Sequence, residues 1–176
     1  MPKPFAVVFA GVPGSSKSIV AYYLSGEFNL PMFSTDNIRY EVKEDLRVDN
    51  INLPHALAEY EKRQAERRLW LLKKGNPLII DGSVDRHWAA YKQQLKAAGY
   101  DWFLINMELS EAFITELFRL TARPKSIEQL PSYLRQHEAF VRQFKNDIML
   151  EITDATFPDR LKIVADGLHK FIDDRQ

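Results

Sequence analysis

One segment of eight residues carries the strongest chemical signal in the chain. It runs from Gly11 to Ser18, reads GVPGSSKS and directly follows the apolar run Phe5–Ala10. The phosphate-binding motif G-x-x-x-x-G-K-[ST] follows a short buried strand. It is a turn of small residues that leads into a helix, and a Lys and a hydroxyl residue open that helix. This chain meets every fixed position of the motif except the second Gly, where it has Ser16.

The physical basis of the motif assigns a part to each residue. Successive backbone N–H groups curl around an anionic phosphate at a helix N-terminus, where partial positive charge is already present. The Lys17 ammonium would reach the β- and γ-phosphates, and the Ser18 hydroxyl would bind Mg²⁺. The alternative is an ordinary helix that Ser15 or Ser16 caps. We expect ATP and Mg²⁺ as cofactors, and contacts to the nucleotide from Gly11, Val12, Pro13, Gly14, Ser15, Ser16, Lys17 and Ser18.

The second candidate segment is Ser34–Arg39, which reads STDNIR. It begins at the last residue of the apolar run Pro31–Ser34. In open α/β sheets the ligand crevice lies outside the carboxyl ends of the strands. Asp36 could accept the proton of an attacking hydroxyl there, and Arg39 could hold an anionic group of the substrate. The alternative is that Asp36 caps a helix while Arg39 is solvated.

A third apolar run, Pro77–Asp81, ends in a carboxylate. This is the form of a Walker-B strand, whose Asp helps to hold Mg²⁺, so we expect Asp81 on the metal side of the site. An Asp after a buried strand also often begins a turn. Asp85 and Arg86 follow closely and are candidates for binding the substrate, although a helix start on the surface explains them almost as well.

Two arginines, Arg119 and Arg123, stand four residues apart on one helical face. That face lies opposite the apolar stripe of Phe113 and Leu117. Two guanidinium groups could close over a triphosphate and stabilise the charge that develops during transfer, so both are candidate catalytic residues. Solvated arginines in helix ion pairs, for example with Glu116, are the alternative.

The elements that position these residues alternate between strands and helices. Further apolar runs at Trp102–Met107 and Leu161–Ala165 complete five expected strands. Helical spacing predicts a helix over Ile19–Phe28, a long helix ending at Gly75, one that Ser110 caps, and one beginning after Pro131. The order implies right-handed crossovers and a doubly wound α/β sheet. The segment from Thr121 to Ser132, with two prolines, is a candidate mobile loop.

Composition narrows the class of protein. The chain has 176 residues, 45% hydrophobic and 27% charged, which fits one globular domain over residues 1–176. Lys plus Arg equals Asp plus Glu, at 24 each, so no excess charge favours extended nucleic acid or a membrane surface. The absence of Cys suits a reducing compartment, and we expect a cytoplasmic protein with no membrane span. No metal-ligand spacing appears among the histidines, and we assign no role to His55, His87, His137 or His169.

Together these segments resemble a known group. The GVPGSSKS loop, STDNIR, LIIDG and the paired arginines are similar to small P-loop kinases, nearest to the polynucleotide 5′-kinase, zeta-toxin and chloramphenicol phosphotransferase-like group. The resemblance implies a three-layer fold with a five-stranded parallel sheet in the order 2-3-1-4-5 and a small lid that closes over ATP. It implies that Asp36 activates the acceptor hydroxyl, Arg39 anchors the substrate, and Arg123, less surely Arg119, belongs to the lid. The chain departs from this group at Ser16, where the group usually has Gly. If that position requires φ > 0, a non-Gly residue there costs about 1–2 kcal/mol.

These observations lead to one expected function and two alternatives. We expect an ATP-dependent kinase that transfers the γ-phosphate to a hydroxyl of a small-molecule acceptor. The alternatives are an NTPase or nucleotide-binding switch without such an acceptor, and a kinase of nucleic-acid 5′-ends. Asp36 and Arg39 favour the small-molecule kinase because they supply an acceptor site. The balanced charge counts against extended nucleic acid, whose binding needs excess Lys and Arg.

Overall fold

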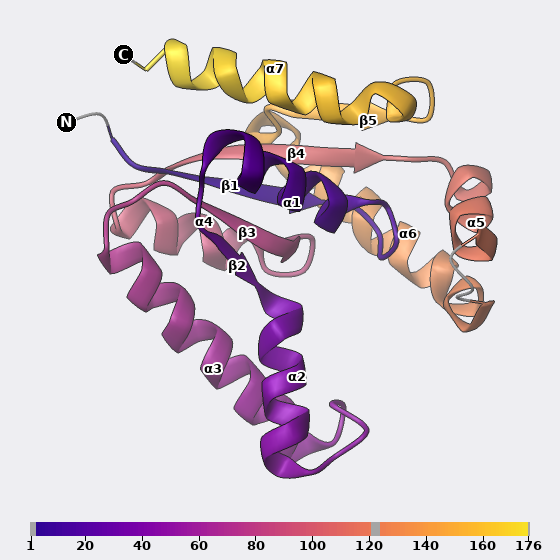
Figure 1. Cartoon of the computed structure of the whole chain (residues 1–176). Coiled ribbons are helices and arrows are strands. Elements are labelled where there is room, and N and C mark those ends of the chain that lie inside the picture. Colours follow the sequence, from indigo (N-terminus) through magenta and orange to yellow (C-terminus); the bar gives the residue numbers. More distant parts are fainter. Residues whose placement is uncertain (1–2, 121–123, 176) are drawn as a thin grey trace.

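A five-stranded parallel sheet forms the centre of the computed structural model, which describes residues 3–120 and 124–175 (Figure 1). The strands run in the order β2-β3-β1-β4-β5, every neighbouring pair is parallel, and the expected sheet order is therefore confirmed. The strands are β1 (Phe5–Ala10), β2 (Met32–Ser34), β3 (Leu78–Ser83), β4 (Asp101–Glu108) and β5 (Leu150–Thr153).

Helices cover both faces of the sheet, because each central strand is apolar on both sides. The helices are α1 (Lys17–Phe28), α2 (Thr35–Leu46), α3 (Pro54–Lys73), α4 (Trp88–Ala97), α5 (Glu111–Leu120), α6 (Pro124–Phe144) and α7 (Arg160–Asp173). In β1, Val7 and Phe9 enter one hydrophobic cluster with α1 and α7, while Ala6 and Val8 enter a second cluster with α2, α3 and α4. Figure 1 shows the same division, with α1 and α7 on one side and α3 and α4 on the other.

The fifth strand is not where the sequence predicted it. Leu161–Ala165 belongs to α7, and the strand is β5, four residues that pair only with β4 at the edge of the sheet. Val164, Ala165 and Leu168 are the buried residues of α7, a helical spacing that a window of five residues is too short to reveal. The prediction of a strand at Leu161–Ala165 was therefore wrong.

The expected mobile loop is also largely helical. Helix α6 begins at Pro124 rather than after Pro131, which lies inside it. Apolar packing keeps this first part of the helix ordered despite the missing N–H of Pro131, since Leu130 is buried and Ile127 and Leu134 pack against the same cluster. Residues 121–123, and with them Arg123, lie outside the described residues. Within the described part of the chain, no helix is long and apolar enough to cross a membrane.

Candidate functional site

The loop from Gly11 to Ser18 joins β1 to α1 at the carboxyl end of the sheet. Gly11 and Gly14 have φ values of 134° and 80°, which favour glycine. A Cβ on Gly11 would lie 2.8 Å from the Cβ of Met107, and one on Gly14 would lie 2.4 Å from Cε1 of Phe118. The loop therefore packs so closely against β4 and α5 that both positions require glycine.

Lys17 is the buried cation of this loop. Its Nζ donates to the carbonyl oxygens of Gly11 at 2.7 Å and Val12 at 2.6 Å, and to Oγ of Ser15 at 3.1 Å. Burial lowers the pKa of the ammonium from 10.5 to about 8, against the opposing charges of Asp85, Asp81 and Asp36. The loop thus holds a positive charge in a setting of low polarity, where an electrostatic contact with an anion is stronger than in water.

Ser18 and Asp81 bring two oxygen donors together from neighbouring elements. Ser18 Oγ, in the first turn of α1, donates to Oδ1 of Asp81 at 3.0 Å, and Ser34 Oγ donates to Oδ2 at 3.4 Å. Burial raises the pKa of Asp81. A hydroxyl and a carboxylate are the ligands that Mg²⁺ prefers, and Mg²⁺ usually takes only one or two carboxylates because it keeps several waters. These residues fit that ion, although the described residues contain no group of three or more His, Asp or Glu that could hold a metal ion by themselves.

Asp36 and Arg39 lie at the start of α2 and form an ion pair at 3.4 Å. Their side chains are 58% and 47% exposed, so the carboxylate is open to solvent beside the loop. The N-cap of α2 is Ser34, which makes Asp36 a residue of the first turn rather than the cap. The charge of Asp36 acts on both Lys17 and Asp81 and by itself raises the pKa of each.

Asp85 and Arg86, the candidates for substrate binding, make contacts within the protein. Asp85 Oδ1 accepts from the backbone N–H of Gly11 at 3.0 Å, and Oδ2 lies 2.8 Å from Nδ1 of His137. Arg86 Nε donates to Oε1 of Gln136 at 2.6 Å. The structure thus places Asp85 beneath the loop, and its role as a substrate ligand stays a prediction.

Arg119 does not reach the loop in this structure. Its side chain is 68% exposed and pairs with Oε2 of Glu116 at 3.5 Å, as the alternative interpretation expected. A surface pair of this kind contributes little to stability. Since Arg123 lies outside the described residues, the catalytic role of both arginines stays a prediction.

Two residues at the loop were missed by sequence reasoning, Arg160 and His137. Arg160 Nε, at the start of α7, donates to Oγ of Ser16 at 3.1 Å, and its guanidinium lies 4.1 Å from the ring centroid of Phe157. No motif in the sequence links positions that are 144 residues apart. For His137 a signal existed, because it is a single polar residue on the apolar stripe of a helix.

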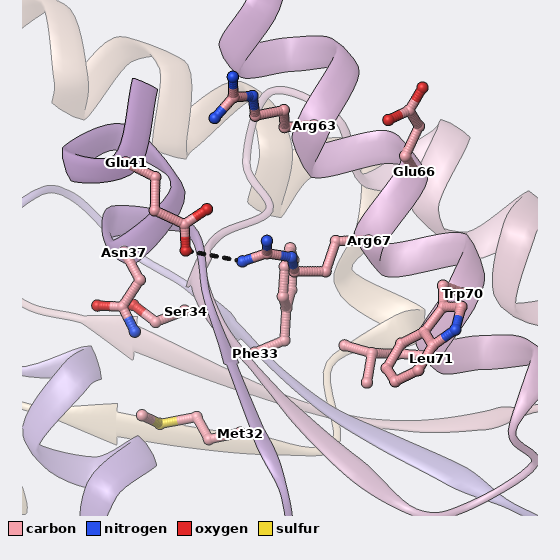
Figure 2. Close-up of a pocket in the computed structure, with 10 residues that line it drawn as sticks. All are labelled: Met32, Phe33, Ser34, Asn37, Glu41, Arg63, Glu66, Arg67, Trp70 and Leu71. Carbon is pink, nitrogen blue, oxygen red and sulfur yellow. Dashed lines mark hydrogen bonds and ion pairs between the residues drawn. The ribbon is translucent and has the colours of Figure 1, made fainter. Parts of the chain in front are cut away.

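A pocket of about 700 Å³ lies between α2, α3 and the edge strand β2 (Figure 2). Glu41 and Arg67 form an ion pair across it at 2.9 Å. Asn37 and Glu41 line it from α2 and lie about 100° and 140° around the helix axis from Asp36, so they point in a different direction from that carboxylate. The pocket is lined by Met32, Phe33, Ser34, Asn37, Glu41, Arg63, Glu66, Arg67, Trp70 and Leu71. It shares Ser34 with the candidate site, and its Trp70 is exposed.

Comparisons with known proteins locate this fold among solved structures. No family model matches the sequence, and a search of curated protein sequences finds no match. Gluconokinase from Sinorhizobium meliloti 1021 is similar with a TM-score of 0.65 and 17% identity, covering 99% of this chain and 97% of that chain. The APS kinase of Mycobacterium tuberculosis, in complex with AMPPNP and APS, is similar with a TM-score of 0.60 and 19% identity, covering 96% and 99%. Shikimate kinase from Aquifex aeolicus is similar with a TM-score of 0.60 and 17% identity, covering 96% and 98%.

These similarities show that the chain has the fold of small P-loop kinases. At such low sequence identity they show the fold and not the activity. The finer resemblance to polynucleotide 5′-kinases, zeta-toxins and chloramphenicol phosphotransferases stays a prediction.

Proposed function

We propose that the protein is an ATP-dependent phosphotransferase that moves the γ-phosphate to a hydroxyl group of a small-molecule acceptor. One observation carries this proposal: the carboxyl end of the sheet holds a buried Lys in a phosphate-binding loop, a hydroxyl–carboxylate pair suited to Mg²⁺ and an open carboxylate. Ligands bind at that end of open α/β sheets. The solved kinases of the same fold, one of them in complex with AMPPNP and APS, support the proposal.

The loop and its metal pair would bind the nucleotide. When bound, ATP supplies the phosphoryl group, and Mg²⁺ neutralises charge on its β- and γ-phosphates. Lys17 exchanges its contacts to the Gly11 and Val12 carbonyls for phosphate oxygens, and the N-terminus of α1 directs its free N–H groups at the same anion. Ser18 and Asp81 would hold the metal ion.

Asp36 would orient and deprotonate the acceptor. As the acceptor oxygen bonds to the γ-phosphorus, the carboxylate takes the hydroxyl proton, and the oxygen that bridged the β- and γ-phosphorus leaves with ADP. A carboxylate in this position is typically worth about 10²–10⁴-fold in rate. Arg39, paired with Asp36, keeps that side chain oriented and would bind an anionic group of the acceptor.

Three further arginines have proposed roles: Arg86 would bind the acceptor, while Arg119 and Arg123 would act in the transfer. Arg86 is exposed after β3, and Arg119 ends α5 with most of its guanidinium in solvent. Closure over the nucleotide would bring guanidinium groups to the charge that develops on the phosphoryl oxygens and exclude water.

Transfer of labelled γ-phosphate from ATP tests the proposal directly. The wild type and the variants Lys17→Ala and Asp36→Asn are incubated with Mg²⁺, labelled ATP and separate pools of sugars, amino alcohols, nucleosides and short oligonucleotides. The proposal predicts a labelled small-molecule product that neither variant forms at the wild-type rate. Release of free phosphate at the same rate with every pool would instead identify an NTPase, and label on oligonucleotide 5′-ends would identify a nucleic-acid kinase.

A further inference from the structure

A chain of charged groups around the buried His137, separate from the residues proposed for phosphoryl transfer, links α6 to the start of the phosphate-binding loop. His137 of α6 is only 4% exposed and lies between two carboxylates. Its Nδ1 is 2.8 Å from Oδ2 of Asp85, and its Nε2 is 3.2 Å from Oε2 of Glu108. The other oxygen of Asp85 accepts from the backbone N–H of Gly11 at 3.0 Å and from Ser83 Oγ at 2.6 Å.

The geometry requires that His137 carry a positive charge. A neutral imidazole has one N–H and one acceptor nitrogen, whereas an ionised carboxylate can only accept. Both ring nitrogens face carboxylate oxygens, so only the doubly protonated ring donates to both Asp85 and Glu108. Burial alone would lower the pKa of His137, but the two carboxylates outweigh it and raise the pKa to about 9.

The surroundings of the triad leave no other cation to replace His137 among the described residues that contact it. Glu108 Oε2 also accepts from Nδ2 of Asn106 at 2.9 Å, and the same Nδ2 lies 3.5 Å from Oε2 of Glu151 on β5. The charge of Lys17 also acts on Asp85, but its Nζ donates to loop oxygens rather than to that carboxylate. Without the charge of His137, the carboxylate of Asp85, whose side chain is only 9% exposed, would lose the cation that separates it from the partly exposed Glu108, which is costly.

We infer that His137 is a positioning residue for the phosphate-binding loop: through Asp85 it fixes the backbone N–H of Gly11, and with it the geometry in which the loop binds a phosphate. The inference rests on the proposed nucleotide binding for its effect on affinity, but not for its effect on Gly11. It also joins α6, which begins at Pro124 just after the arginine pair, to the loop that those arginines are proposed to face.

The first test compares His137→Gln with His55→Gln, an exposed histidine on α3 that serves as the matched control. Amide hydrogen exchange is measured at Gly11 and along α1 in both variants without nucleotide. We expect Gly11 to exchange about tenfold faster in His137→Gln, the equivalent of one charge-assisted hydrogen bond, and to be unchanged in His55→Gln. Unchanged exchange at Gly11 in a folded His137→Gln protein would overturn the inference.

The second test follows the affinity for Mg-ATP as a function of pH. At about pH 7 the wild type should bind about tenfold more tightly than His137→Gln. That ratio should fall toward one as the pH rises through about 9, because wild-type His137 then loses its proton. Lys17 also loses its proton in this range in both proteins, so the ratio of the two affinities, and not either affinity alone, is the quantity compared. A ratio that does not change with pH would show a role in packing alone and contradict the inference.

If His137→Gln does not fold, a third variant, Glu108→Gln, tests the inference. Glu108→Gln keeps the pair of Asp85 and His137 but removes one of the two charges that raise the pKa of the imidazole. The loss of ATP affinity should then occur at lower pH than in the wild type, and an unshifted profile would overturn the inference. If the wild type binds no ATP at any pH, the proposed function fails, while exchange at Gly11 still tests the positioning by Asp85 and His137.

Discussion

Ser16, the one departure from the phosphate-binding motif, leads to a prediction about stability with two opposing contributions. Its φ of 73° lies in the left-handed region, where a non-Gly residue costs about 1–2 kcal/mol. Its hydroxyl accepts a hydrogen bond from Nε of Arg160 at 3.1 Å. A hydrogen bond to a charged group stabilises by about 1.5–3 kcal/mol, and we take the lower end because Arg160 is partly exposed. The two contributions nearly cancel.

Two substitutions separate these contributions. Ser16→Gly removes both the strain and the hydrogen bond, so the free energy of unfolding should change by less than about 1 kcal/mol. Ser16→Ala removes the hydrogen bond but keeps the Cβ in the left-handed region, so it should lower the free energy of unfolding by about 1–2 kcal/mol. Urea denaturation at neutral pH measures both values, and an unchanged slope with urea shows that the comparison is valid.

A double-mutant cycle with Arg160→Met then isolates the hydrogen bond. Ser16→Ala and Arg160→Met together should destabilise by about 1–2 kcal/mol less than the sum of the two single variants. Arg142→Met, at an exposed position of α6, is the control and should be additive with Ser16→Ala. Equal stability of the Gly and Ala variants would refute the strain at Ser16, and a coupling below about 0.3 kcal/mol would refute its contact with Arg160.

Three further predictions concern ligand binding, turnover and pH. Lys17→Ala should weaken Mg-ATP binding by about 1.5–3 kcal/mol, measured by calorimetry, because it removes a charge-assisted contact to phosphate; unchanged affinity would remove the basis of the nucleotide site. Asp36→Asn should lower kcat for the true acceptor by about 10²–10⁴-fold while ATP affinity persists, and loss of both would point to a structural role. The folded pKa of His137 is about 9, above its ordinary 6.5, so its contribution to stability is complete below about pH 6.5 and is lost as the pH rises through about 9. The difference in unfolding free energy between the wild type and His137→Gln should shrink over that interval, and a constant difference would contradict a charged His137.

The sequence predicted those parts of the fold that are determined by residues close together in the chain. The run Phe5–Ala10, the loop and α1 form one continuous pattern, and the structure has them as expected. The order of the sheet followed from a resemblance that depends on these local motifs, and it is confirmed. The secondary structure of the region after Pro124 was harder to predict from the sequence. Two prolines favoured a loop there, yet the burial of Leu130 against the core stabilises a helix that local preferences do not indicate.

The candidate site likewise contains residues that the sequence predicted and contacts that it did not predict. Lys17, Ser18, Asp36 and Asp81 follow strands at fixed spacings, so the sequence brings them to one edge of the sheet, where the structure also has them. The contact between Arg160 and Ser16 joins two segments that only the tertiary fold brings together. The partners of His137 likewise come from the residues after β3 and from the end of β4, and no spacing in the chain encodes such contacts.

The central claim is that ATP bound at this loop gives its γ-phosphate to a hydroxyl of a small molecule. The most direct measurement follows labelled γ-phosphate from ATP in the presence of pooled hydroxyl-bearing metabolites, with product mass determined by spectrometry and Asp36→Asn run in parallel. The account predicts a product heavier than one metabolite by a single phosphoryl group, formed by the wild type and about 10²–10⁴-fold more slowly by Asp36→Asn. Label found only in free phosphate, at a rate that no metabolite pool changes and that Asp36→Asn retains, would contradict it.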